Sequence, residues 1–164
     1  METFRVVAIP EDIAKYVRAK RVAPVYGHPV YAEVANGHGP CRLCLRTFQI
    51  EAERRVLFTY DCFHGKEDLP LPGPVFIHET ACERYAEDGG FPEDLRSLEL
   101  TLNAYGAGRR LVAEEHVADG RVEGVIERLF ARAEVDYIHV RNTRAGCYAF
   151  AIERPGAQAA LRKA

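Results

Sequence analysis

Two short cysteine and histidine motifs constrain this chain more than any other feature of its sequence. The first is a C-x-x-C motif at Cys41 and Cys44, and the second is an H-x-x-x-C motif at His78 and Cys82. Two close pairs of ligands separated by a loop have the spacing of four-ligand zinc sites, because two intervening residues let the chain curl until both sulfurs reach one ion. Residues four positions apart share one face of a helical turn. The spacing therefore predicts that the four side chains meet around a structural zinc ion.

Two other uses of these thiols stay open. Cysteine packs as a small apolar residue, and a chain of 164 residues can bury enough surface to fold without a metal. A C-x-x-C at a helix N-terminus can also serve redox chemistry, and Arg42 and Arg46 would favour the thiolate. However, no thioredoxin-like βαβ unit is expected around the motif, and Pro40 precedes the pair instead of lying between the cysteines. Structural zinc and buried metal-free thiols are the leading interpretations.

The cysteine count and the N-terminus predict residence in the cytosol. Five cysteines, an odd number, do not suggest a disulfide framework. The segment from Met1 to Arg5 lacks a basic region followed by a long apolar stretch, so no signal peptide is expected. No window approaches the roughly 20 consecutive apolar residues of a membrane span, so no membrane association is expected.

The charge balance argues against a nucleic-acid binder that works by bulk charge. The chain has 22 basic and 24 acidic residues, with a net charge of -2. A classical serine hydrolase is also not expected, because Ser97 is the only serine and no G-x-S-x-G motif surrounds it. The partners that remain are a small anionic ligand or another protein.

Hydrophobic periodicity predicts a single α+β domain over residues 1–154, with a flexible tail at 155–164. Strands are expected at residues 4–9, 30–34, 56–60, 75–78, 98–104, 111–117, 135–141 and 148–152. Helices are expected from Pro10 to Arg21, over 122–133 with Asp119 as N-cap, and over one or two turns at 79–87. The strands cluster as hairpins, which favours a mainly antiparallel sheet with two or three helices packed against it.

A polar pocket is the second candidate site. Tyr137, His139 and Arg141 alternate along one expected strand and so point to the same face. The guanidinium of Arg141 suits a carboxylate or a phosphate. The alternative is the solvated face of an edge strand, since antiparallel sheets commonly wet one side. Asn142 and Cys147, which lie nearby in the sequence, are further candidates for this pocket. The expected loop over 61–74 contains candidates for the pocket or for a hard metal: Asp61, His64, Glu67 and Asp68. Charged loop residues are commonly only solvated.

Four segments together resemble a known family. They are residues 39–46, residues 60–63, residues 73–78 with Cys82, and residues 139–148. In these segments the chain is similar to the bacterial domain-of-unknown-function 1203 family, over most of its length from Phe4 to Arg154. The resemblance implies a single bacterial domain with these segments at its shared centre. It implies no activity, because none is established for the family.

Three functions follow from these features. The first is a small metal-stabilised binding or interaction module, with zinc as a structural cofactor. The second is an enzyme of unknown reaction that uses the pocket around His139 and Arg141. The third is a metal-free scaffold with buried thiols that acts through a protein surface.

Overall fold

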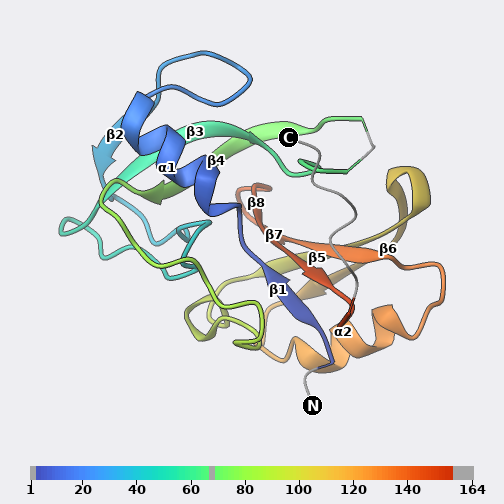
Figure 1. Ribbon diagram of the computed structural model, residues 1–164. Helices are drawn as coiled ribbons and strands as arrows, with labels where there is room; N and C mark the ends of the chain where they lie inside the picture. The colour runs from blue at the N-terminus through green and yellow to red at the C-terminus, as the bar shows by residue number, and fades with distance from the viewer. Residues whose placement is uncertain (1–2, 67–68, 157–164) are drawn as a thin grey trace.

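Two antiparallel sheets form the framework of the protein (Figure 1). The computed structural model describes residues 3–66 and 69–156, which contain eight strands and two α-helices. In spatial order the larger sheet consists of β1 (Arg5–Val7), β8 (Tyr148–Glu153), β7 (Tyr137–Asn142), β5 (Leu100–Gly106) and β6 (Arg110–Val117). The smaller sheet consists of β2 (Tyr31–Val34), β3 (Arg54–Asp61) and β4 (Pro72–His78). The antiparallel pairing is as expected, but two sheets replace the expected one.

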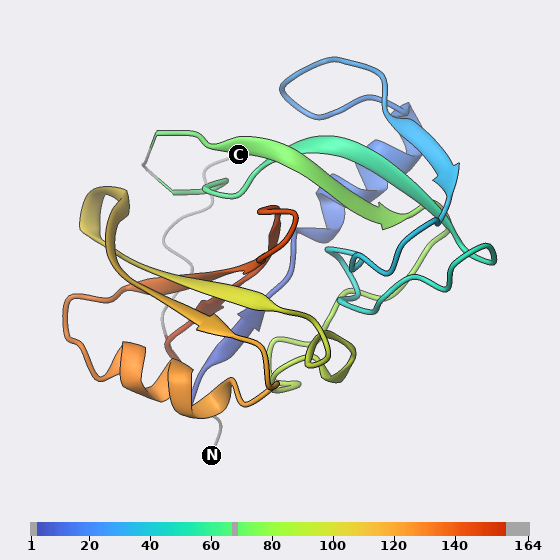
Figure 2. The same cartoon turned by 180° about the vertical axis from the view of Figure 1, so that it is seen from behind.

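The sheets and helices stack in layers. The smaller sheet lies over one face of the larger sheet, and α2 (Glu123–Phe130) covers the other face (Figures 1 and 2). Successive side chains of a strand point to opposite faces. Ile138 and Val140 of β7 therefore join the core against α2, whereas Tyr137 joins the core between the sheets. The helix α1 (Glu11–Lys20) contributes Ala14 and Val17 to this second core.

The first helix follows its sequence signals closely. Glu11 and Asp12 lie in its first turn, and Arg18 and Lys20 lie in its last turn, which complements the helix dipole. The helix ends at Arg21, whose backbone is left-handed (φ 58°) and whose N–H bonds to the carbonyl of Val17. None of the helices in the described ranges is long and apolar enough to span a bilayer.

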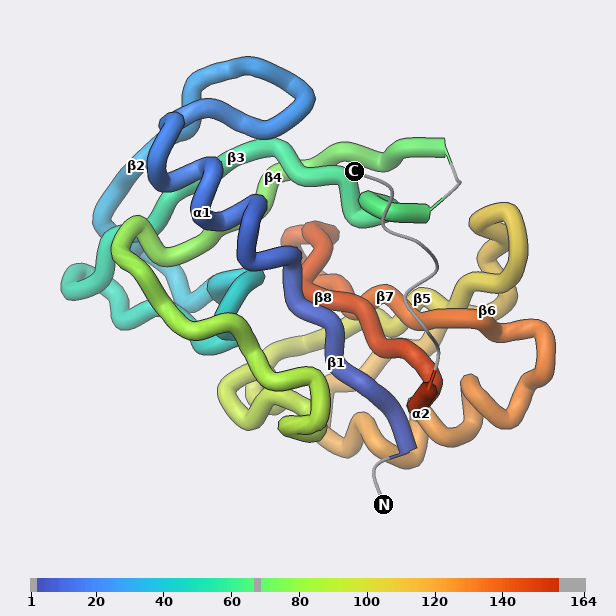
Figure 3. Tube along the Cα trace, viewed as in Figure 1, coloured from blue at the N-terminus to red at the C-terminus, as the bar shows by residue number. Residues whose placement is uncertain are grey.

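The prediction of a helical turn at residues 79–87 is wrong. This segment is irregular and runs beside β1 in the tube view (Figure 3). Its polar groups bond to distant segments: Tyr85 N donates to the carbonyl of Leu43, and the Arg84 guanidinium donates to the carbonyls of Ala8 and Ile9. These tertiary hydrogen bonds replace the local bonds that a helix would make.

Smaller differences concern where elements begin and end. The short 3₁₀ helices Glu93–Leu95 and Ala107–Arg109 precede β5 and β6. The expected N-cap at Asp119 is wrong, because α2 begins after Val122 and the Asp119 carboxylate accepts from Arg121 N inside the preceding turn. The loop expected over 61–74 is shortened, since β3 ends at Asp61 and β4 begins at Pro72. Of the expected tail, residues 157–164 lie outside the described residues, as do Glu67 and Asp68.

Candidate metal centre

The two predicted ligand motifs meet in space. The sulfurs of Cys41, Cys44 and Cys82 and a ring nitrogen of His78 all lie within 4.8 Å of one another. Within the described residues, this is the only group of three or more cysteine, histidine or acidic side chains that could hold a metal ion. Three of the four residues are buried, and Cys82 is partly exposed. The arrangement is therefore a close Cys₃His cluster.

A tight backbone turn presents the first two ligands. Cys41 N donates to the carbonyl of Arg46 (2.9 Å), and Leu45 N donates to the carbonyl of Cys41 (2.8 Å). Leu45 has a positive φ of 57°, a conformation that usually belongs to glycine and costs a branched side chain about 1–2 kcal/mol. Its side chain is 1% exposed and packs in the core against α2. Core packing of Leu45 therefore stabilises the turn at a position where a zinc knuckle commonly has glycine.

The second pair of ligands comes from the end of a strand and not from a helix. His78 is the last residue of β4, and Cys82 lies in the irregular segment that follows. Cys41 Sγ lies 3.8 Å from Cys82 Sγ, and Cys44 Sγ lies 3.4 Å from His78 Nδ1. The backbone N of His78 donates to Cys41 Sγ (3.4 Å), which ties the end of β4 directly to the turn.

Charged side chains surround the cluster. Glu53 Oε1 lies 3.3 Å from His78 Nε2, within ion-pair distance. The other carboxylate oxygen of Glu53 accepts from Gln49 N (2.8 Å), which fixes the side chain. Arg18 of α1 donates to Cys82 Sγ (3.3 Å) and to the carbonyl of His78 (3.1 Å). The ring therefore contacts a carboxylate, and one sulfur contacts a cation.

The cluster perturbs the proton affinity of its own members. Burial raises the pKa of Cys41 above the ordinary thiol value, and hydrogen bonds with Cys44 and Cys82 raise it further. Hydrogen bonds from Cys41 and Cys82 lower the pKa of Cys44. Burial lowers the pKa of His78, but its contacts with Cys44 and Cys82 outweigh burial and raise it to about 10. These shifts therefore favour a thiolate at Cys44 close to a cationic ring at His78.

Sequence reasoning did not identify three residues at or near this centre as functional: Glu53, Arg18 and Arg42. Arg18 lies 60 positions before His78 in the chain, and nothing in the sequence indicates that α1 passes the ligands. Arg42 lies inside the C-x-x-C motif, but the sequence indicates only that it is a neighbour of the thiols. Its guanidinium donates to the carbonyl of Tyr148 (2.7 Å) and to Cys147 Sγ (2.9 Å). The position of Arg42 within the motif was the one available signal.

Replacing Glu53 with glutamine should weaken metal binding without unfolding the protein. A carboxylate beside the second nitrogen of a ligating histidine orients the ring and raises its basicity, and loss of such a group typically costs about 10- to 100-fold in metal affinity. We expect a loss of this size in competition with a chromophoric zinc chelator. Glu51→Gln, which changes an exposed carboxylate two positions away, is the matched control. Equal zinc affinity in the two variants would contradict a role for Glu53.

The residues of the predicted polar pocket have several separate partners. The Asp61 carboxylate accepts from Phe63 N (3.1 Å) and Leu71 N (2.9 Å), and so joins the two ends of the loop between β3 and β4. The Asn142 side chain accepts from Ala145 N (2.9 Å) within the β7–β8 turn. His64 is exposed, and its ring centroid lies 6.1 Å from that of Tyr60. Asp61 and Asn142 therefore hold turns in place, and Cys147 contacts Arg42, as described above.

The strand β7 lies inside the larger sheet, so the alternative of a solvated edge strand is wrong. It pairs with β8 on one side and β5 on the other. Tyr137 and His139 are buried beneath the smaller sheet, and His139 is 0% exposed. Arg141 is partly buried and donates to Cys62 Sγ (3.3 Å) and to the carbonyl of Gly146 (3.2 Å).

Acid should destabilise the protein partly through His139. Burial lowers the pKa of this imidazole well below its ordinary value, and the positive charges of Arg141, Lys66 and Arg109 add to the effect. The unfolded chain takes up a proton near pH 6.5 and the folded chain does not, so the free energy of unfolding falls by up to about 1.4 kcal/mol per pH unit below pH 6.5. We expect His139→Leu to remove this part of the pH dependence. Urea unfolding of both proteins between pH 5 and pH 8 tests it, and parallel pH profiles would contradict it.

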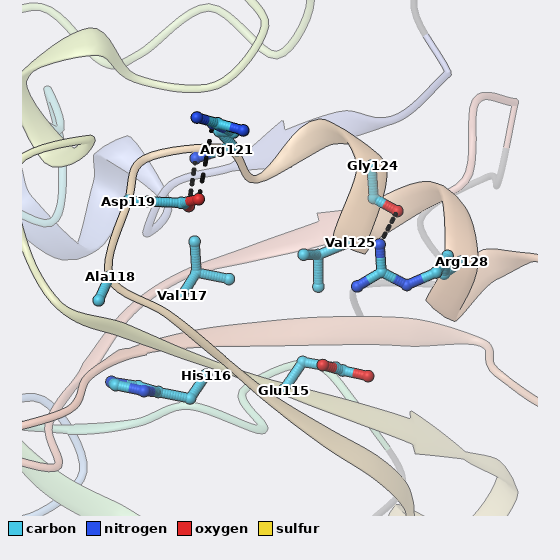
Figure 4. A pocket seen from close by; sticks show the side chains of 9 residues that line it. All are labelled: Glu115, His116, Val117, Ala118, Asp119, Arg121, Gly124, Val125 and Arg128. Atoms are coloured by element: carbon cyan, nitrogen blue, oxygen red, sulfur yellow. Dashed lines mark hydrogen bonds and ion pairs between the residues drawn. The ribbon is translucent and has the colours of Figure 1, made fainter.

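A surface groove of about 710 Å³ lies apart from the metal centre, between the end of β6 and α2 (Figure 4). Its two arginines contact groups within their own segments. Arg121 lies 3.6 Å from the carboxylate of Asp119, and Arg128 donates to the carbonyl of Gly124 (3.2 Å). None of the four candidate metal ligands lines this groove.

A protein-family model matches most of the chain. Residues 38–154 match the model of a family described as "Protein of unknown function (DUF1203)". The matched range contains all four candidate ligands and the strands from β3 to β8. No curated protein and no solved structure matches the chain.

Proposed function

Because this chain belongs to the DUF1203 family, whose function is unknown, we propose a function from the geometry of its own side chains. The protein is a small zinc-stabilised binding module in which Cys41, Cys44, His78 and Cys82 hold one structural zinc ion. The observation that carries this proposal is the convergence of three sulfurs and one ring nitrogen within 4.8 Å.

The distances between the ligand atoms support a single tetrahedral ion. Zinc bonds of about 2.3 Å to sulfur and about 2.05 Å to nitrogen give tetrahedral edges of about 3.8 Å between two sulfurs and about 3.6 Å between sulfur and nitrogen. The cluster has 3.8 Å between Cys41 Sγ and Cys82 Sγ and 3.4 Å between Cys44 Sγ and His78 Nδ1. Thiolate and imidazole ligands in this geometry favour zinc over the hard cations magnesium and calcium.

The composition of the ligand set supports a structural role. Three thiolates and one imidazole complete a tetrahedron, whereas a catalytic zinc ion keeps a position for water or substrate. Zinc with three thiolates would carry a net charge of -1, and Arg18 supplies a cation at Cys82 Sγ. The ion would join the Cys41–Cys44 turn to the end of β4 and to the segment after it.

The remaining parts of the proposal concern location and partners. All five cysteines of the chain lie within the described ranges, and all are free thiols. Reduced, metal-binding thiols suit the cytosol, where disulfides are rare. The ligand of the module is a small anion or another protein, since the chain has no basic excess for bulk binding of nucleic acid.

Native mass spectrometry tests the zinc proposal. Protein purified with added zinc and without chelator should carry one zinc ion per chain, and a strong chelator should remove it. Cys62→Ser, which changes a buried thiol outside the cluster, should keep the ion. Cys44→Ser should lose it. A wild-type mass equal to that of the bare polypeptide would reject zinc and favour the metal-free scaffold.

A further inference from the structure

His139 is a buried titratable group that the zinc centre does not use. It lies in the middle of β7 with none of its surface exposed, and neither ring nitrogen has a hydrogen-bond partner among the described residues. A buried polar group without a partner costs about 1–3 kcal/mol, and buried polar atoms in native proteins are nearly always paired. The position of this imidazole therefore calls for an explanation other than packing.

Aromatic rings surround the imidazole. The ring centroids of Phe63, Tyr148, Tyr105 and Tyr137 lie 4.9, 5.1, 5.2 and 5.2 Å from that of His139. The three tyrosines belong to strands of the larger sheet and are 6–8% exposed. Phe63 belongs to the turn after β3, so it is the one ring of the four that is not held in the larger sheet. Aromatic rings in tilted and edge-to-face arrangements thus surround His139 on several sides.

Three positively charged side chains lie near these rings. Lys66 Nζ lies 3.9 Å from the centroid of the Tyr137 ring, and the guanidinium of Arg109 lies 4.5 Å from that of Phe63. Arg141 follows two positions after His139 on the same face of β7. All three are close enough to act on the charge of His139.

Among the described residues, these three cations have one carboxylate within ion-pair range. Arg109 donates to the carbonyls of Leu69 and Pro70, and Arg141 donates to a sulfur and a carbonyl. Lys66 alone has a carboxylate within ion-pair range in the described part of the chain, Glu153 at 3.7 Å. Among the described residues, the aromatic surroundings of His139 therefore carry more positive than negative charge.

We propose that the region around His139 between the two sheets binds a small aromatic carboxylate that carries a hydroxyl group. The ligand ring packs against the tyrosines after Phe63 turns aside, and its carboxylate pairs with Arg109 and Lys66. A neutral imidazole has one donor and one acceptor nitrogen, so either nitrogen can bond to a hydroxyl group, which both donates and accepts. This site uses none of the zinc ligands, and the inference does not rest on the zinc proposal.

The test uses the full-length, zinc-loaded protein and three compounds: 4-hydroxybenzoate, benzoate and inorganic phosphate. We expect 4-hydroxybenzoate to bind with a submillimolar Kd and to shift the ring ¹⁵N resonances of His139 in NMR spectra. Benzoate should bind about tenfold more weakly, and phosphate should leave these resonances unchanged. Arg109→Gln should weaken 4-hydroxybenzoate binding about tenfold. Arg128→Gln changes another arginine that has no carboxylate partner among the described residues but lies on α2, and this variant should bind like the wild type.

His139→Leu separates a binding role from a structural one. If His139 is present for binding, the variant should keep its zinc, be more stable than the wild type without ligand, and lose 4-hydroxybenzoate binding. Unchanged binding by this variant would overturn the proposal. So would phosphate binding as tight as that of 4-hydroxybenzoate, or no shift of the His139 resonances by any compound at about 10 mM. Because zinc content is measured in the same samples, failure here is distinct from failure of the zinc centre.

Discussion

Cys41→Ser should lower the free energy of unfolding by about 5 kcal/mol or more, the largest effect that we expect from a single substitution. Structural zinc contributes about 10–16 kcal/mol of binding free energy in small zinc domains, whereas a whole domain is stable by only about 5–15 kcal/mol. Cys41 is 0% exposed, and its sulfur also accepts the backbone N–H of His78. Serine would therefore remove a proposed metal ligand and alter the link to β4.

Urea unfolding with saturating zinc measures this loss. Cys62→Ser is the matched control, because it changes a buried thiol that lies outside the cluster. We expect the control to lose no more than about 1–2 kcal/mol. A strong chelator should bring the wild type close to the Cys41→Ser variant and leave the variant unchanged. Equal losses in the two serine variants, or a wild type that is insensitive to the chelator, would refute the expected stabilisation.

Arg42→Ala should cost about 3–5 kcal/mol, although Arg42 is not a metal ligand. Its side chain is 1% exposed and reaches from the cysteine turn to the start of β8, where it donates to the carbonyl of Tyr148 and to Sγ of Cys147, the residue before the strand. Burial lowers the pKa of Arg42, while the neighbouring Cys147 acts in the opposite direction. Alanine would leave buried acceptors without donors and would open a cavity between the turn and the larger sheet.

Two further variants isolate the role of the guanidinium. Arg42→Lys keeps the positive charge but lacks the planar guanidinium group that donates to several acceptors. We therefore expect a smaller loss of unfolding free energy, about 2 kcal/mol. Arg128→Ala removes an arginine from the surface of α2 and should change stability by less than about 0.5 kcal/mol. Arg42→Ala should still bind one zinc ion at saturating zinc, unlike Cys41→Ser. Wild-type stability in Arg42→Ala would show that the link between the turn and β8 is unimportant.

Local sequence patterns were sufficient for several parts of this protein. The alternating strands, the apolar face of α2 and the charge pattern of α1 all depend on neighbours within a few positions, which a sequence displays directly. The candidate ligand set was also predicted, because C-x-x-C and H-x-x-x-C place each pair of donors within reach of one ion. The match of residues 38–154 to the DUF1203 family agrees with the resemblance that these motifs suggested.

The tertiary structure decided what each buried face packs against. Periodicity shows that β7 has a polar face, but only the pairing of β7 with β5 and β8 buries His139. Residues 79–87 were expected to be helical, yet bonds from Arg84 and Tyr85 to distant carbonyls hold Cys82 near the other ligands without a helix. Glu53, Arg18 and Arg42 reach the centre from separate elements. Contacts between residues far apart in the chain leave no periodic trace in the sequence, which is why these features were visible only in the folded protein.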